Sequence, residues 1–239
     1  MFIRLTLLAI FFVWVIRAPG AYRSNLMIAA AQDNPELRLA HQEASCQQAF
    51  LNSMKLPPGD QHRQEAISNL ALVRWRQLNL SNSESLSRLA LAENKPSKSY
   101  DRVLVNNMIT LAGIYRDQSK FTEAKESYLT VLEYDRRFLT ASDPFIGRDL
   151  SNLGVNQYIE ASSKDRGSER TRLMQQANDY LDQALKLFNK NPKNPQRTSI
   201  ALSNQYLVLR DLGEAEKAAS VKAQADALDA ACHRLCKLP

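Results

Sequence analysis

The chain has 239 residues, an ordinary apolar content of 44% and a net charge of +6, which argue against a disordered protein and a polytopic membrane protein. Only seven residues are glycine, so glycine-rich phosphate loops are not expected. Leucine and alanine supply 61 residues, whereas valine, isoleucine and threonine together supply 26, a balance that favours helix over strand. We therefore predict an all-α protein.

The N-terminus is basic at Arg4, and residues 5–16 then contain only one polar residue, Thr6. Twelve helical residues cover about 18 Å, which is shorter than the roughly 30 Å core of a bilayer. A short apolar run of this kind, followed by small residues, is typical of a secretory signal peptide. Residues 1–20 are therefore predicted to be either a cleaved signal peptide or a membrane anchor formed by residues 2–16. Both alternatives place the remainder of the chain outside the cytoplasm, where the protein would be periplasmic, secreted or anchored to the membrane. Only this segment would contact the membrane.

Residues 21–60 are predicted to be a linker and a capping helix. Asn34 before Pro35 is typical of a helix start, and Pro57-Pro58-Gly59 ends that helix. Beyond it, apolar residues recur at helical spacing between clear breaks, and no stretch alternates as a strand. The predicted helices lie near 61–79, 83–93, 100–118, 121–138, 144–162, 168–190, 195–211 and 214–232.

Two series of residues repeat along the predicted helices. Pairs of a large residue followed by a small one recur at spacings of 41 and 42: Leu70-Ala71, Leu111-Ala112 and Leu153-Gly154. A second series places small residues seven apart with a larger one between them, as in Ala124/Tyr128/Val131 and Ala177/Leu181/Ala184. A fixed period near 42 residues predicts a repeat architecture.

Residues 107–128 resemble a tetratricopeptide repeat, in the longer form of about 42 residues found in kinesin light chains. The resemblance implies that residues 61–239 form a tetratricopeptide-like repeat domain, a right-handed solenoid of stacked antiparallel helix pairs. The small residues would let paired helices approach closely, because a larger side chain there would hold them apart. Gln157 and Gln205 depart from the pattern, since the family prefers Tyr and Leu at these positions.

One unit is longer than the others. Leu153 and Ala177 are 24 residues apart, whereas Leu111 and Ala124 are 13 apart, and the additional residues around 162–170 are polar. Either both helices of this pair are longer and project together, or the excess forms an exposed loop. The extension is either a tolerated surface feature or a binding element.

No pattern for catalysis, metal binding or cofactor binding is present. The sequence has no nucleophile elbow, phosphate loop or HExxH motif, so we predict neither enzymatic activity nor a cofactor. Cys232 and Cys236 are four residues apart on a predicted helix. Two alternatives remain for them: a disulfide between the two, or thiols that are free or paired with another molecule. A metal site is not expected, because this neighbourhood offers at most three of the four ligands of structural zinc.

The candidate binding site follows from the resemblance. In such repeats the residue before the Leu of the first helix faces the concave groove, and here these residues are Asn69, Thr110, Asn152 and Asn204. An amide side chain carries both the donor and the acceptor that an extended peptide backbone needs. Three arginines are expected to meet acidic side chains of the peptide: Arg116, Arg148 and Arg210.

The sequence therefore predicts an exported or membrane-anchored scaffold that binds another polypeptide, with acidic character, in its concave groove. The alternative is a structural spacer in a membrane-associated assembly, without a peptide-binding groove. Nucleic acid is not an expected partner, because basic and acidic residues are interleaved and only Arg74-Trp75-Arg76 resembles a basic stripe with an aromatic residue.

Overall fold

The computed structural model describes residues 35–94, 98–190 and 195–235, and the side chains of 39–94, 98–190 and 195–230. The predicted signal peptide or anchor (1–20) lies outside these residues. The described residues contain only helices and their connections, which confirms the predicted all-α class. The helices are α3 (Pro35–Ser53), α4 (Gln61–Arg76), α5 (Leu80–Glu93), α6 (Arg102–Asp117), α7 (Phe121–Phe138), α8 (Pro144–Ser162), α9 (Ser168–Lys190), α10 (Pro195–Leu212) and α11 (Ala215–Leu235).

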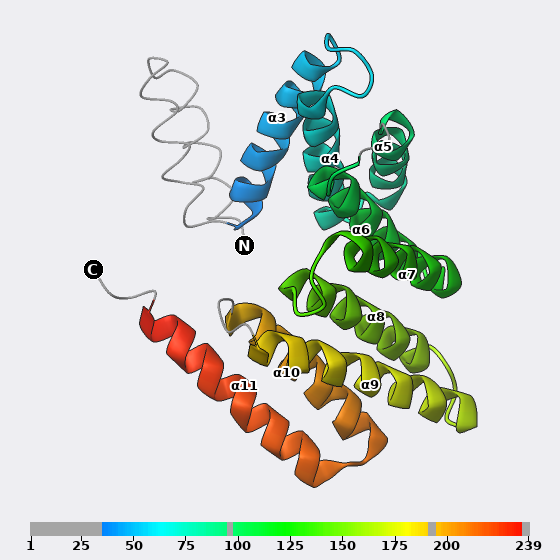
Figure 1. Ribbon diagram of the computed structural model, residues 1–239, viewed down its shortest axis with the longest axis vertical. Helices are drawn as coiled ribbons and strands as arrows, with labels where there is room; N and C mark the ends of the chain where they lie inside the picture. The colour runs from blue at the N-terminus through cyan, green and yellow to red at the C-terminus, as the bar shows by residue number, and fades with distance from the viewer. Residues whose placement is uncertain (1–34, 95–97, 191–194, 236–239) are drawn as a thin grey trace, which may run out of the picture.

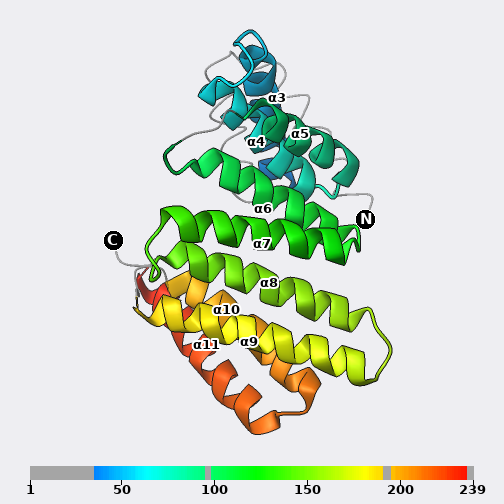
Figure 2. The same ribbon diagram turned by 45° about the vertical axis from the view of Figure 1, so that its right-hand side comes forward.

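Consecutive helices pack against one another as antiparallel pairs, and the pairs stack into a curved solenoid (Figure 1). The first helices of the pairs, α4, α6, α8 and α10, lie on the inner side of the curve, and α4 also contacts α6 while α8 contacts α10. The second helices α5, α7 and α9 lie on the outer side. Figure 2 shows that the N-terminal ends of α6 and α8 lie at the same edge of the stack. The inner helices therefore present equivalent positions side by side.

Aspartate side chains start three of the four inner helices. Asp60, Asp101 and Asp143 are the N-caps of α4, α6 and α8, and each accepts hydrogen bonds from backbone N–H groups of the first turn. These acceptors satisfy donors that have no partner within the helix.

The turn inside three helix pairs has the same geometry. Leu78, Ser119 and Gly213 follow α4, α6 and α10 with φ angles of 59°, 61° and 82°. In each case the next N–H closes the turn on a helix carbonyl, as Lys120 does on Tyr115 at 2.8 Å. This left-handed residue reverses the chain tightly, although only Gly213 adopts it without a Cβ penalty.

Small residues set the distance between paired helices, as the sequence predicted. Ala112 and Ala124 are fully buried between α6 and α7. In the next pair, a Cβ added to Gly154 would lie 2.8 Å from Cγ of Leu181 and 3.0 Å from the carbonyl oxygen of Ala177. The backbones of α8 and α9 therefore approach as closely as glycine allows.

The two glutamines that depart from the repeat pattern are buried and bonded to the outer helix. Gln157 Nε2 donates to Oε1 of Gln176 at 2.9 Å. Gln205 Nε2 donates to Oδ1 of Asn178 at 3.2 Å and Oδ1 of Asp182 at 3.1 Å. Hydrogen bonds replace apolar packing at these two positions and satisfy the buried amide N–H groups, whereas Oε1 of Gln157 is buried without a hydrogen-bond partner.

The additional residues of the longer unit extend its two helices. The pair α8 and α9 has 19 and 23 residues, whereas α6 and α7 have 16 and 18. Only the short connection 163–167 links the longer pair. Of the two alternatives, the structure therefore shows the projecting helix pair.

Candidate functional site on the inner helices

Three asparagines occupy the predicted binding position with unbonded side chains. Asn69 on α4 is exposed, and Asn152 on α8 and Asn204 on α10 are half-buried. None of these three amides hydrogen-bonds to another side chain or backbone group within the described residues. Thr110, the fourth predicted residue, is only 8% exposed, and its hydroxyl donates to the carbonyl of Asn106 at 2.8 Å. Thr110 therefore has no free donor, and the free amides are the three asparagines.

Each of the three predicted arginines is followed in the sequence by an aspartate, and each bonds to it. Nε of Arg116 donates to Asp117 at 3.1 Å, Nε of Arg148 to Asp149 at 2.8 Å and Nε of Arg210 to Asp211 at 2.8 Å. Sequence reasoning missed these aspartates, although the repeated Arg-Asp dipeptide signals them. An acidic side chain of a partner would have to share each guanidinium with the neighbouring carboxylate.

Two of these pairs also join neighbouring inner helices. Trp75 Nε1 on α4 donates to Oδ2 of Asp117 on α6 at 2.7 Å. The Tyr158 hydroxyl on α8 donates to Oδ2 of Asp211 on α10 at 2.9 Å. Each aspartate thus links an arginine to an aromatic ring of the preceding inner helix, and the same arrangement occurs in both halves of the solenoid.

The third arginine lies in a buried network. Arg148 bonds to Asp149 at 2.7 Å and to Asp135 of α7 at 3.0 Å, and both carboxylates are fully buried. One oxygen of each carboxylate, Asp135 Oδ1 and Asp149 Oδ2, is buried without a hydrogen-bond partner. Burial and, to a smaller extent, the charge of Asp135 raise the pKa of Asp149 to about 7, against the lowering effect of Arg148. Asp149 therefore holds its proton to a much higher pH than an exposed aspartate does.

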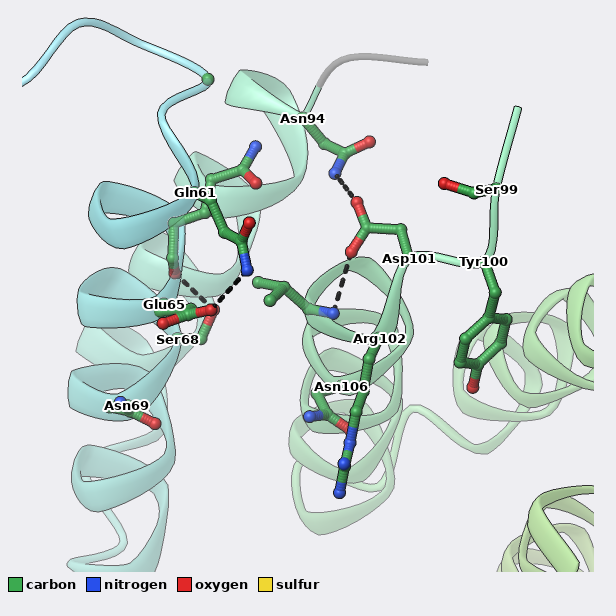
Figure 3. Close-up of a pocket in the computed structure, with 13 residues that line it drawn as sticks. Gln61, Glu65, Ser68, Asn69, Asn94, Ser99, Tyr100, Asp101, Arg102 and Asn106 are labelled. Atoms are coloured by element: carbon green, nitrogen blue, oxygen red, sulfur yellow. Dashed lines mark hydrogen bonds between the residues drawn. The ribbon is translucent and has the colours of Figure 1, made fainter. Parts of the chain in front are cut away.

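A polar cleft of about 640 Å³ lies between α4 and α6. Figure 3 shows Gln61, Glu65, Ser68 and Asn69 of α4 on one side and Asp101, Arg102 and Asn106 on the other. The Gln61 amide donates to Glu65 at 2.9 Å, and the Asn94 amide donates to Asp101 at 2.9 Å. Asn69 is therefore one of several polar groups along this cleft.

A second, shallower depression of about 330 Å³ surrounds Asn204 between α10 and α11. Ile200, one turn before Asn204, lines it and is 60% exposed. An amide without a partner thus lies beside an exposed apolar side chain, a combination that suits a peptide backbone with an apolar residue.

The described residues hold no group of three or more His, Cys, Asp or Glu side chains arranged to bind a metal ion. Cys46 is half-buried on α3, and burial raises the pKa of its thiol. The possible Cys232–Cys236 disulfide lies outside the described side chains. None of the helices described here is long and apolar enough to cross a membrane.

No family model and no curated protein matches the sequence. The structure is similar to a chain from Podosopora anserina with nearly identical TPR-like repeats, assigned as a kinesin light chain, with a TM-score of 0.61 and 16% identity over 91% of this chain and 99% of that one. A variant of the same protein gives a TM-score of 0.63 and 15% identity over 87% and 94% of the two chains. BtubC (BKLC) from P. vanneervenii gives a TM-score of 0.51 and 19% identity over 82% of this chain and 90% of that one. The fold is therefore that of a tetratricopeptide-like repeat solenoid, as the repeated sequence positions predicted.

Proposed function

We propose that this protein is a non-catalytic scaffold that binds an extended segment of another polypeptide along its inner helices. Solenoids of this type have extended concave surfaces that are used for binding. The single observation that supports the proposal is the set of free amides, Asn69, Asn152 and Asn204, at one repeat position of three inner helices. A peptide backbone has an N–H and a C=O at every residue, and these amides would pair with both groups.

The surroundings of two of the amides favour a peptide over a small molecule. Asn69 lies in the open cleft between α4 and α6, and Asn204 lies beside exposed Ile200. These sites are far apart along the stack and shallow, so one extended chain would reach both, whereas a compact ligand would not. We also propose that the N-terminal segment exports the protein or anchors it, so the partner would be extracytoplasmic.

The experiment uses full-length protein to capture a partner from a membrane extract, with identification by mass spectrometry and then a binding measurement with the purified partner. In the double variant Asn152→Ala, Asn204→Ala we expect at least tenfold weaker binding, because two backbone pairings of about 1 kcal/mol each are lost. Helicity and melting temperature should not change, since neither amide has an internal partner.

The matched control is the double variant Gln175→Ala, Gln183→Ala, which removes two exposed amides from the outer helix α9. It should bind the partner as tightly as wild type. Undiminished binding by the folded Asn152/Asn204 variant would reject the inner amide site. If both double variants lost binding equally, the partner would bind the outer surface or the projecting pair α8–α9. If the protein is only a structural spacer, no captured partner would depend on these amides.

A further inference from the structure

Two carboxylates line the polar cleft between α4 and α6. They belong to Glu65 of α4 and to Asp101, the N-cap of α6, and Arg102 is the one basic side chain among the described residues that line the cleft. Figure 3 shows Glu65 and Asp101 on opposite sides of the cleft, whereas the Arg102 side chain extends away from both. Its guanidinium carbon lies 5.7 Å from the centroid of the Phe145 ring on α8. Negative charge therefore predominates between the two carboxylates.

The protein itself does not neutralise the Glu65 carboxylate. Glu65 is half-buried, and it accepts one hydrogen bond, from the Gln61 amide at 2.9 Å. Asp101 accepts hydrogen bonds from two backbone N–H groups and from the Asn94 amide at 2.9 Å. Within the described residues, neither carboxylate forms an ion pair. Both keep a full charge that only neutral donors contact, and Glu65 has the fewer bonds of the two.

A buried amide adds one more acceptor to the wall of this cleft. Gln64 lines the cleft and is only 6% exposed. Its Nε2 donates to the backbone carbonyl of Glu93 at 3.2 Å, so the donor side of the amide is engaged. Its Oε1 accepts no hydrogen bond from the described residues and is not fully enclosed by them. Because an unpaired acceptor is costly in a buried amide, this oxygen favours a donor that enters the cleft.

We propose that the cleft binds a basic side chain, arginine or lysine, of the peptide held along the inner helices. The inference rests on the proposed function, because it identifies the residue that such a peptide places beside Asn69. An ammonium or guanidinium group has only donors, and Glu65 and Gln64 Oε1 supply acceptors for it. The bond to the Glu65 carboxylate would be charge-assisted, and such bonds are about twice as strong as neutral ones.

Other occupants fit the cleft less well. An acidic side chain would be repelled by both carboxylates, so the charges here favour the sign opposite to the acidic character predicted for the peptide from the sequence. That prediction depended on three arginines, each of which the structure bonds to an aspartate. A bare metal ion needs oxygen ligands in direct contact around it, whereas this cleft of about 640 Å³ has the size of a side-chain site.

The test uses the full chain labelled with ¹⁵N and two probes, the N-acetyl methylamides of arginine and of lysine. The side-chain amide resonances of Gln64, Asn69 and Asn94 report on the cleft itself. We expect both probes to shift these resonances saturably, with half-saturation at about 10 mM. The norleucine and glutamate derivatives, compared at equal ionic strength, should give no saturable shift, because one lacks the charge and the other reverses it.

Substitution of Glu65 tests the carboxylate. Glu65→Gln should weaken the binding of both probes about fivefold, because a charge-assisted hydrogen bond becomes a neutral one. Glu65→Lys should abolish it. Both variants should fold, since the Gln61 amide is the only described side chain bonded to Glu65. The matched control is Glu126→Gln, at an exposed residue of the outer helix α7, which should bind the probes as wild type does.

Equal shifts with the norleucine or glutamate derivative, or unchanged affinity in Glu65→Gln, would overturn the inference. The purified partner distinguishes this failure from a failure of the proposed function. If Asn152→Ala, Asn204→Ala weakens partner binding while Glu65→Gln does not, the inner amide site stands and the basic residue is rejected. If the probes bind the cleft but the amide double variant keeps its partner, the preference of the cleft for a cation stands and the inner amide site is rejected.

Discussion

Gly154 lies where α8 and α9 approach each other most closely, and its replacement tests the packing of the solenoid. In an unobstructed helix, Gly→Ala stabilises a protein by about 1 kcal/mol. Here the new Cβ would lie 2.8 Å from Cγ of Leu181 and 3.0 Å from the Ala177 carbonyl oxygen. The Leu181 side chain can shift, but the carbonyl moves only with its helix, so overpacking should cost about 1–3 kcal/mol.

The two effects have opposite signs, and their sum gives the expected outcome. Gly154→Ala should lower the free energy of unfolding by up to about 2 kcal/mol. Gly154→Leu should lower it by about 3 kcal/mol, with a fall in melting temperature of about 6–12 °C. Ala141→Leu, at an exposed residue between α7 and α8, adds a similar volume without a contact to displace and should change stability little.

Urea denaturation followed by circular dichroism measures these changes, with the m-value as a check that the unfolding transition keeps its width. Stabilisation of Gly154→Ala by about 1 kcal/mol, as for an exposed helix, would show that the close approach of α8 and α9 is absent. The same conclusion would follow if Gly154→Leu and Ala141→Leu had equal midpoints.

Three further variants test local features. Leu78→Gly should raise stability by about 0.5–1 kcal/mol in urea denaturation, because Leu78 has a φ of 59° and is 77% exposed, whereas Leu78→Ala, which keeps the Cβ, should give no gain. Ser83→Ala should cost about 1 kcal/mol in the same assay, since the buried hydroxyl donates to the Ala71 carbonyl at 2.7 Å, and exposed Ser85→Ala on the same helix should be neutral. The pKa of Asp149 is about 7 in the folded protein, so the folded state binds more protons than the unfolded state between about pH 4 and 7, and this contribution to stability is lost as pH rises through 7. Melting temperatures from pH 5 to 8 should fall less steeply in Asp149→Asn, and equal slopes would contradict the raised pKa.

The sequence determined the helices and their pairing. Capping aspartates, prolines and apolar spacing are local signals, so the predicted helix bounds agree with the observed ones within about four residues. The 42-residue period also identified Ala124 and Gly154 as close contacts, because only small residues allow paired backbones to approach. The sequence also predicted where the asparagines among the binding residues lie. Each precedes the large residue of a first helix, and this repeated position lies on equivalent inner helices.

The tertiary structure decided which polar groups are free. Thr110 shares the repeat position of the asparagines, but its hydroxyl bonds back to its own helix. The predicted arginines are bonded to aspartates. Around the Phe145 ring lie the guanidiniums of Arg102, Arg148 and Arg197, which come from three helices and are 46 to 95 residues apart in the chain. Whether a polar side chain is already hydrogen-bonded, and whether charged side chains cluster, depends on which side chains of different repeats come into contact. Local propensity and periodicity determine the helices, but they carry no information about these contacts between repeats. The side chains come together only through the geometry in which the helices stack.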